Sequence, residues 1–210
     1  MTVTEHKLTL PLTDADVRDL KVGDFVYLTG EIFATAGIPT HERLLGCLDG
    51  VEELPFDMQG GALFHLGSLN EENAQGELDI VYMNPTTSTR FNSHMPRLIP
   101  GLGLRATGGK GGLDAACAAT MAEAGCVYLS FLGGGAPIIT SGIRKVTGIG
   151  WPEFISHYRI VRIEVEELGP LTVGIDAQGQ SIYDQTAQSA GAAREDILQE
   201  LRRDRDASAD

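Results

Sequence analysis

Two loops hold the residues with the clearest capacity for chemistry. Residues 84–90 read Asn-Pro-Thr-Thr-Ser-Thr-Arg, and residues 108–112 read Gly-Gly-Lys-Gly-Gly. Arg90 offers a planar fork that matches a carboxylate, and Lys110 offers a compact positive charge. The glycines around Lys110 let the backbone turn sharply and approach a ligand. The pattern predicts a site for a small anion; two surface turns with incidental basic residues are the alternative.

The charge balance of the chain gives these two cations more weight. The formal net charge is −13 and the pI is about 4.7. Because contacts to phosphate need clustered Lys and Arg, the composition argues against nucleic acid as a partner. An acidic chain that binds an anion must place its few cations locally, which favours Arg90 and Lys110. Further basic candidates are Arg105, Arg144 and Lys145.

Length and composition indicate one cytoplasmic globular domain. The chain has 210 residues, of which 42% are hydrophobic, enough for a substantial core. No apolar run reaches the roughly 20 residues of a membrane span, and the first residues lack the apolar segment of a secretory signal. Three cysteines without CxxC spacing favour free thiols, and their spacing matches no known metal-ligand pattern. We therefore expect no metal ligands in this chain.

Residue patterning predicts an α+β fold. Apolar and β-branched segments predict strands at residues 8–12, 24–34, 61–66, 78–83, 126–132, 158–168 and 171–175, and a further short strand after a turn at 176–179. A turn at Gly169-Pro170 is expected to separate 158–168 from 171–175. Helices are expected at residues 13–20, with Thr13 as N-cap, and at 39–48, 113–124 and 190–205. The chain then divides into a domain at 1–188 and a C-terminal helix with a polar tail at 189–210.

Two segments resemble nucleotide-binding motifs, but neither matches its motif fully. Gly101-Leu-Gly103 resembles the start of a dinucleotide-binding fingerprint, but Pro96 and Pro100 interrupt any strand before it. Lys110 is followed by Gly111, where a phosphate-binding P-loop has Ser or Thr. Nucleotide-dependent enzymes are therefore disfavoured.

Several longer segments carry a family resemblance. In order along the chain they are VGDFVYLTGEIFATA, THERL, ELPFDMQGGALFH, NPTTSTRFN, GGKGG, VYLSFLGGGAPIITSGIRKV and IVRIEVEELGPLTVGIDAQGQSIYD. Together they resemble the β subunit, or C-terminal domain, of class I fumarate hydratases and L-tartrate dehydratases. The resemblance covers roughly residues 20–184 and implies a swivelling β/β/α domain of the α+β class.

The same resemblance implies roles for individual residues. Thr86 matches the hydroxyl that removes a proton from the substrate, and His41 matches the histidine that ends the family's Ala-Arg-Asp-x-Ala-His segment. A hydroxyl is a weak base, so Thr86 needs a pKa lowered by nearby cations. The resemblance places the substrate-binding roles on Thr87, Arg90, Lys110 and Gly111.

A cofactor and a partner are also implied by the resemblance. Such proteins complete their site with an α subunit that carries a [4Fe–4S] cluster, whose open iron acts as a Lewis acid on the leaving hydroxyl. No cofactor is expected on this chain itself. The resemblance thus implies a hydro-lyase that adds or removes water on a small hydroxy carboxylic acid, in a hetero-oligomer or a homodimer.

Departures from the family pattern make the substrate uncertain. Ala36-Gly37-Ile38 stands where the family has Ala-Arg-Asp, and Ser68 and Asn84 replace a proline and a glycine. Without that arginine a second carboxylate lacks compensation, which favours a substrate with one carboxylate. We expect arginine at 37 with aspartate at 38 to restore a preference for dicarboxylates. The alternative is a non-catalytic relative that binds a carboxylate or only a partner.

Overall fold

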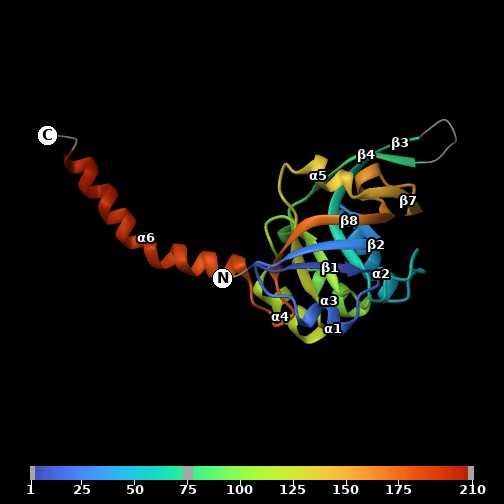
Figure 1. The fold of residues 1–210 in the computed structure, drawn as a ribbon, viewed down its shortest axis with the longest axis horizontal. Helices are drawn as coiled ribbons and strands as arrows, with labels where there is room; N and C mark the ends of the chain where they lie inside the picture. Colours follow the sequence, from blue (N-terminus) through green and yellow to red (C-terminus); the bar gives the residue numbers. More distant parts are fainter. Residues whose placement is uncertain (1–2, 73–77, 208–210) are drawn as a thin grey trace.

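A closed ring of strands forms the centre of the protein (Figure 1). The computed structural model describes residues 3–72 and 78–207. Within them, β3 pairs in parallel with β2 and β5, and β5 pairs in parallel with β6. The ring closes because β8 runs antiparallel to both β6 and β2. Its members are β2 (Phe25–Thr35), β3 (Ala62–Glu72), β5 (Ala106–Gly109), β6 (Val127–Ser130) and β8 (Ile160–Ile175).

Three more strands extend this ring. They are β1 (Glu5–Thr9), parallel to β2; β4 (Leu78–Pro85), antiparallel to β3; and β7 (Ile143–Gly150), antiparallel to β8. The pairing of β3 with β4 carries the chain directly to the Pro-Thr-Thr turn, since β4 ends at Pro85.

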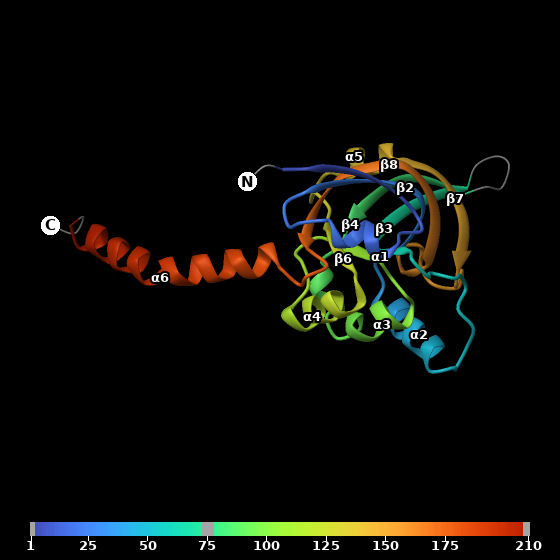
Figure 2. The same cartoon turned by 60° about the horizontal axis from the view of Figure 1, so that its bottom comes forward.

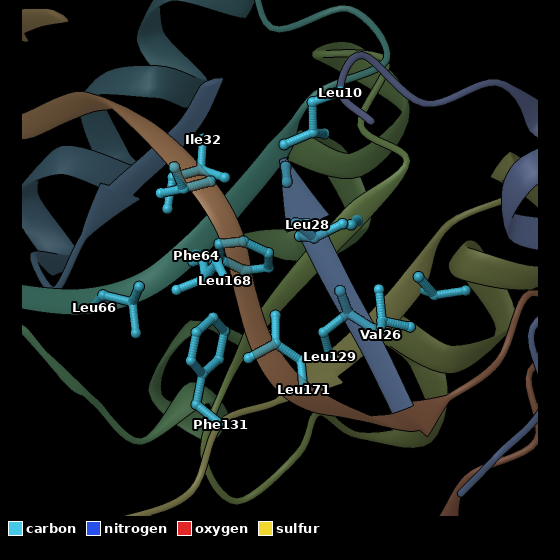
Figure 3. Packing of buried hydrophobic residues seen from close by; sticks show 14 of the residues in the cluster. Leu10, Val26, Leu28, Ile32, Phe64, Leu66, Leu129, Phe131, Leu168 and Leu171 are labelled. Carbon is cyan, nitrogen blue, oxygen red and sulfur yellow. The ribbon is translucent and has the colours of Figure 1, made fainter. Parts of the chain in front are cut away.

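The core has two parts, one inside the ring and one beside it. Figure 3 shows the first, where alternate residues of β2, β6 and β8, such as Leu28, Leu129 and Leu171, meet in the interior. The second lies between the ring and the helices that Figure 2 shows on one side of it. These helices are α2 (Ile38–Leu48), α3 (Met95–Gly101) and α4 (Ala115–Ala124). The α+β class predicted from the sequence is confirmed.

Most of the predicted elements are present with shifts of a residue or two. The first helix, α1 (Asp14–Arg18), begins at a capping box in which Thr13 and Asp16 bond each other's backbone N–H. The helix α4 ends at Gly125 in the left-handed region, at φ 66°. The predicted strand at 8–12 is wrong by three residues, because β1 ends at Thr9, just before Pro11 removes a backbone donor.

The largest correction concerns the predicted turn at Gly169-Pro170. The chain does not reverse there, and β8 continues through it as one strand of 16 residues. The irregularity is absorbed by register shifts against β2, around the Leu28↔Leu168 pair. Six elements were not predicted, all of them short: β5, α3, β7, α5 (Ala136–Ser141) and the 3-10 helices η1 (Ser88–Phe91) and η2 (Ser156–Tyr158).

The C-terminal helix begins earlier than predicted. The helix α6 (Ile182–Ala207) starts where the N–H of Asp184 donates to Oγ of Ser181, and the expected strand before it is only a bridge between Ile175 and Ser181. The helix projects away from the barrel (Figure 1), and none of its residues is buried. No helix in the described chain combines the length and apolarity needed to cross a membrane.

Candidate functional site

The Pro-Thr-Thr turn is fixed at the end of β4. The N–H of Thr86 donates to the carbonyl of His65 on β3, at 2.8 Å, one step beyond the Leu66↔Pro85 pair. The backbone then leaves the sheet and enters η1. Thr86 and Thr87 are therefore held half-buried at the point where the strand pairing stops.

The glycine loop lies directly against this turn. The N–H of Lys110 donates to the carbonyl of Thr86, at 3.0 Å, and the N–H of Ser88 donates to the carbonyl of Lys110, at 2.9 Å. This close approach requires Gly109, because a Cβ there would collide with Oγ of Ser88 and lie 3.0 Å from the Thr86 carbonyl. Gly111 follows at φ 82°, in the region that favours glycine. The two loops singled out from the sequence are thus joined by their backbones.

Two exposed cations lie on the joined loops, and one of them reaches the Thr86 hydroxyl. Arg90 and Lys110 are both exposed, and Nη1 of Arg90 lies 3.5 Å from Oγ1 of Thr86. Within the described residues, neither cation forms an ion pair. Other cations of this acidic chain are already paired with carboxylates, among them Arg43, Arg97, Arg144 and Lys145. Arg90 and Lys110 therefore keep donors available for an anion from solution.

A buried chain of hydrogen bonds supports the turn from behind. Oγ of Ser88 lies 2.8 Å from Nδ1 of His65 and 2.8 Å from the hydroxyl of Tyr128 on β6. The Tyr128 hydroxyl also accepts from the N–H of Gly112, at 3.3 Å. Burial raises the pKa of Tyr128, so the phenol stays protonated. These hydrogen bonds link β3, β6, the turn and the glycine loop. Ser88 and Gly112 lie in the loops singled out from the sequence, whereas the parts played by His65 and Tyr128 were not predicted.

His41 belongs to the same buried interior. Its side chain is fully buried, its ring stacks on Phe91 at 4.0 Å, and its Nδ1 donates to the carbonyl of Gly37 over 2.7 Å. Burial lowers the pKa of His41 to about 4, and also lowers that of His65, whose ring centroid lies 5.2 Å away. Both rings are therefore neutral near pH 7. The structure thus places His41 behind the turn, on the buried side of η1, and no contact joins it to the half-buried Thr86.

Gly37 is packed too closely to receive a larger side chain. A Cβ at this position would lie 2.7 Å from Oγ1 of Thr40 and 2.9 Å from Cβ of Tyr158. The hydroxyl of Thr40 also donates to the Tyr158 carbonyl, which holds η2 against the start of α2. An arginine at position 37 would require Thr40 and Tyr158 to move, and the expected shift of preference toward dicarboxylates stays a prediction.

The cysteines do not form a metal site. Cys117 and Cys126 are buried, and burial raises the pKa of each thiol to about 12, which disfavours the thiolate that binds metal. Cys47 is partly exposed on α2. Across the described ranges, no three His, Cys, Asp or Glu side chains gather as metal ligands would. The thiols of this chain therefore do not fit an iron–sulfur cluster.

Comparisons with known proteins agree on one family. A family model described as fumarase C-terminus matches residues 2–186. A putative L(+)-tartrate dehydratase subunit beta from Methanocaldococcus jannaschii is 34% identical over 83% of this chain and 89% of its own length. The L(+)-tartrate dehydratase subunit beta of Escherichia coli K12 is 28% identical over 92% of this chain and 94% of its own length. A putative class I fumarate hydratase from Geobacillus stearothermophilus is 29% identical over 87% of this chain but only 34% of its own length.

Proposed function

Because this chain belongs to the fumarase C-terminal domain family, we propose that it is the β subunit of a hydro-lyase acting on a small hydroxy carboxylic acid. Relatives that match nearly end to end are named as β subunits of L(+)-tartrate dehydratase, and a longer relative is named as a fumarate hydratase. These names support the reaction class. The identity of the substrate has to be argued from the residues of the site.

One observation carries the assignment to this site. Thr86 is bonded through its backbone to Lys110, and its hydroxyl lies 3.5 Å from a guanidinium nitrogen of Arg90. A turn that served only the fold has no need for two exposed cations, neither of them in an ion pair among the described residues, in a chain of net charge −13. In this proposal Arg90 and Lys110 bind the substrate carboxylate, and the backbone of Thr87 and Gly111 lines the carboxylate site.

Thr86 is the base in this proposal. The positive charge of Arg90 favours the ionised form of the hydroxyl, as a nearby cation does for any oxygen acid. The Thr86 oxygen takes the proton from the carbon next to the bound carboxylate. The electron pair of that C–H bond forms the C=C bond, the neighbouring C–O bond breaks, and hydroxide leaves. Proton transfer from Thr86 to that hydroxide gives water and restores the base.

His41 has a structural role in this proposal. Since its ring is fully buried and stacked on Phe91, we assign it the positioning of the turn and no contact with substrate. The catalytic role expected from the sequence has no other geometric support. Its hydrogen bond to Gly37 stays within the first turn of α2, and the stack of its ring on Phe91 joins that turn to the underside of η1.

The proposed site is open to solvent on one side, so the proposal includes a partner subunit that covers it. Arg90 and Lys110 lie on an open surface, and an α subunit is the chain to cover it. A [4Fe–4S] cluster belongs to that partner in this proposal, since the thiols here do not fit one. A stable interface of this kind buries more than about 1,000 Å² in total. Three free cysteines support a cytoplasmic location.

Anaerobic co-purification tests the proposal. The chain, expressed alone and with the reading frame that adjoins it in the genome, is assayed for loss of water from a panel of hydroxy acids, followed as alkene absorbance. We expect turnover only in the two-chain sample. An isolated chain with full activity contradicts the subunit assignment. A stable two-chain complex that binds carboxylates without turnover favours the non-catalytic alternative, to which the missing cation at Gly37 gives support.

A further inference from the structure

The face of β3 and β4 that lies next to Thr86 extends away from Thr86 along both strands. Side chains two residues apart on a strand share a face, and directly opposed residues of antiparallel strands share it too. His65 and Gly67 therefore lie on the same face of β3. Opposite them are Asn84 on β4, which pairs with Gly67, and Thr86 just after the end of β4, whose N–H bonds the His65 carbonyl. At His65 the face is buried, whereas at Gly67 and Asn84 it is partly open.

The short helix η2 borders the open part of this face. A Cβ on Gly67 would lie 3.6 Å from Cβ of His157 and 3.5 Å from Cβ of Ala36. The N–H of Ala36 donates to the carbonyl of His157, at 2.9 Å, and Oγ of Ser156 donates to the Ser68 carbonyl, at 3.4 Å. Glycine at position 67 thus allows His157 to lie over the residue that pairs with Asn84, at the edge of the site.

The polar groups of Asn84 and His157 remain available. His157 is exposed and Asn84 is half-buried, and in the described part of the chain neither side chain forms a hydrogen bond. The His157 ring meets the ring of Tyr158 edge-on, which leaves its nitrogens unbonded. Two residues of a strand span about 6.5–7 Å, so Asn84 lies one such step from Thr86. That step matches the reach of a four-carbon acid whose carboxylate is held at Arg90 and Lys110.

The charges on this edge differ from those at Arg90 and Lys110. Position 37 has no room for a cation, because Tyr158 and Thr40 fill its space. Of the nearby arginines, Arg43 pairs with Glu52 and Glu153, and Arg159 is held by the bond from its Nε to the Phe154 carbonyl. Among the described residues no cation is fixed against Asn84, whereas an amide or hydroxyl would find both a donor and an acceptor on Asn84 itself.

We propose that Asn84 and His157 form a second subsite, which binds an uncharged hydrogen-bonding group at the end of the substrate remote from Arg90 and Lys110. This inference rests on the proposed function and narrows its substrate class. The substrate is a hydroxy acid with one carboxylate and, at its other end, an amide or hydroxyl. His157 and Asn84 then determine specificity, while Thr86 keeps the chemistry.

Three matched probes test the subsite in the reconstituted two-chain complex. They are 3-hydroxypropanoate, its 3-carboxylate (malate) and its 3-carboxamide, which differ only at the remote end. We expect the carboxamide to have the highest kcat/KM. His157→Ala should lower kcat/KM for the carboxamide about tenfold, the effect of removing one partner of a desolvated hydrogen bond, and leave 3-hydroxypropanoate unchanged. His157→Gln, which keeps a donor, should restore much of the loss.

A gain of function sharpens the test. His157→Arg places a cation at the exposed edge, without the collision that Gly37→Arg would cause, and should raise the malate-to-carboxamide ratio of kcat/KM about tenfold. Ile155→Ala, an exposed residue just before η2, is the control and should leave all ratios unchanged.

The outcomes separate this inference from the proposed function. Turnover with a wild-type preference for malate, or ratios that no His157 variant alters, overturns the subsite and leaves the hydro-lyase intact. If the complex turns over none of the probes, calorimetry on the same samples decides. Tighter binding of the carboxamide, lost in His157→Ala, keeps the subsite and rejects the reaction, whereas equal binding of all three probes rejects both.

Discussion

The turn that begins at Thr86 has two sides, which differ in how their polar groups are satisfied. The outer side (Thr86, Arg90 and Lys110) meets solvent, and its cations have no ion-pair partner among the described residues. The inner side consists of the buried residues His41, His65, Ser88, Phe91 and Tyr128, which are stacked or hydrogen-bonded to one another. The difference indicates two separate roles. The inner side holds the backbone of the turn in place, and the outer side presents the groups that bind and react with the substrate.

This division makes separate predictions for the two sides. Substitutions on the outer side should alter turnover or affinity while the fold keeps its stability. Substitutions on the inner side should alter stability first, and activity only through the position of Thr86 and Lys110. A result in which both sides respond alike removes the distinction.

The largest effect is expected at Thr86. Thr86→Ala removes the proposed base, so kcat should fall about 10²–10⁴-fold with KM almost unchanged, because the hydroxyl acts mainly in the transition state. Steady-state kinetics of the two-chain complex measure this. Thr89→Ala, an exposed threonine in the same turn, is the matched control. Full turnover by Thr86→Ala means that the base lies elsewhere.

The inner side should make stability depend on pH. Burial lowers the pKa of His41 from 6.5 to about 4, so between these values the unfolded chain binds more protons than the folded chain. The free energy of unfolding is therefore highest above pH 6.5 and falls as pH decreases toward 4, by about 3 kcal/mol for His41 alone. His65, shifted in the same direction, adds to the loss.

Urea unfolding at pH 7 and pH 4.5 measures this effect. His41→Phe keeps a ring to stack on Phe91 but cannot titrate, so its unfolding free energy should change less between the two pH values. Carboxylates titrate equally in both proteins and cancel in the comparison. Identical pH dependence in wild type and His41→Phe would show that the folded imidazole has no depressed pKa.

Arg90 should affect affinity more than turnover. Arg90→Ala removes a charge-assisted hydrogen bond worth about 1.5–3 kcal/mol, so KM should rise roughly 10–150-fold, with a smaller loss of kcat. Arg97→Ala is a suitable control, since Arg97 is also exposed but pairs with Asp49 on the surface. An Arg90 variant with unchanged KM and a strongly reduced kcat would place the guanidinium at the base and not at the carboxylate.

The outer side could be predicted from the sequence because its signals are local. Proline and glycine define the two loops, and their cations stand out in an acidic chain, so Arg90 and Lys110 were identified without knowledge of the fold. Thr86 was singled out by the family resemblance of the same turn. Their roles remain predictions. What the sequence left unspecified was their mutual distance, which depends on β3 lying between β4 and β5 in the barrel.

The inner side could not be predicted, since its contacts join residues distant in sequence. Ser88 and Tyr128 meet because β5 pairs with β3 and β6, and no periodicity in either segment encodes that pairing. The position of η2 against Gly37 has the same origin. At Gly169-Pro170, local turn chemistry gave the wrong answer because pairing with β2 continues on both sides of the irregularity.

The smallest expected effect, at Ser88, tests whether the two sides are coupled. Ser88→Ala leaves Nδ1 of His65 without its partner and weakens the tie between Tyr128 and the turn, at a cost of about 1–3 kcal/mol in the free energy of unfolding. The backbone bonds between Thr86 and Lys110 remain, so kcat should fall only severalfold, by displacement of the base. Urea unfolding and kinetics of the same preparation measure both, with the exposed Ser93→Ala as control. If Ser88→Ala abolishes turnover while stability is unchanged, Ser88 takes part in the chemistry directly, and the inner side is part of the active site and not merely its support.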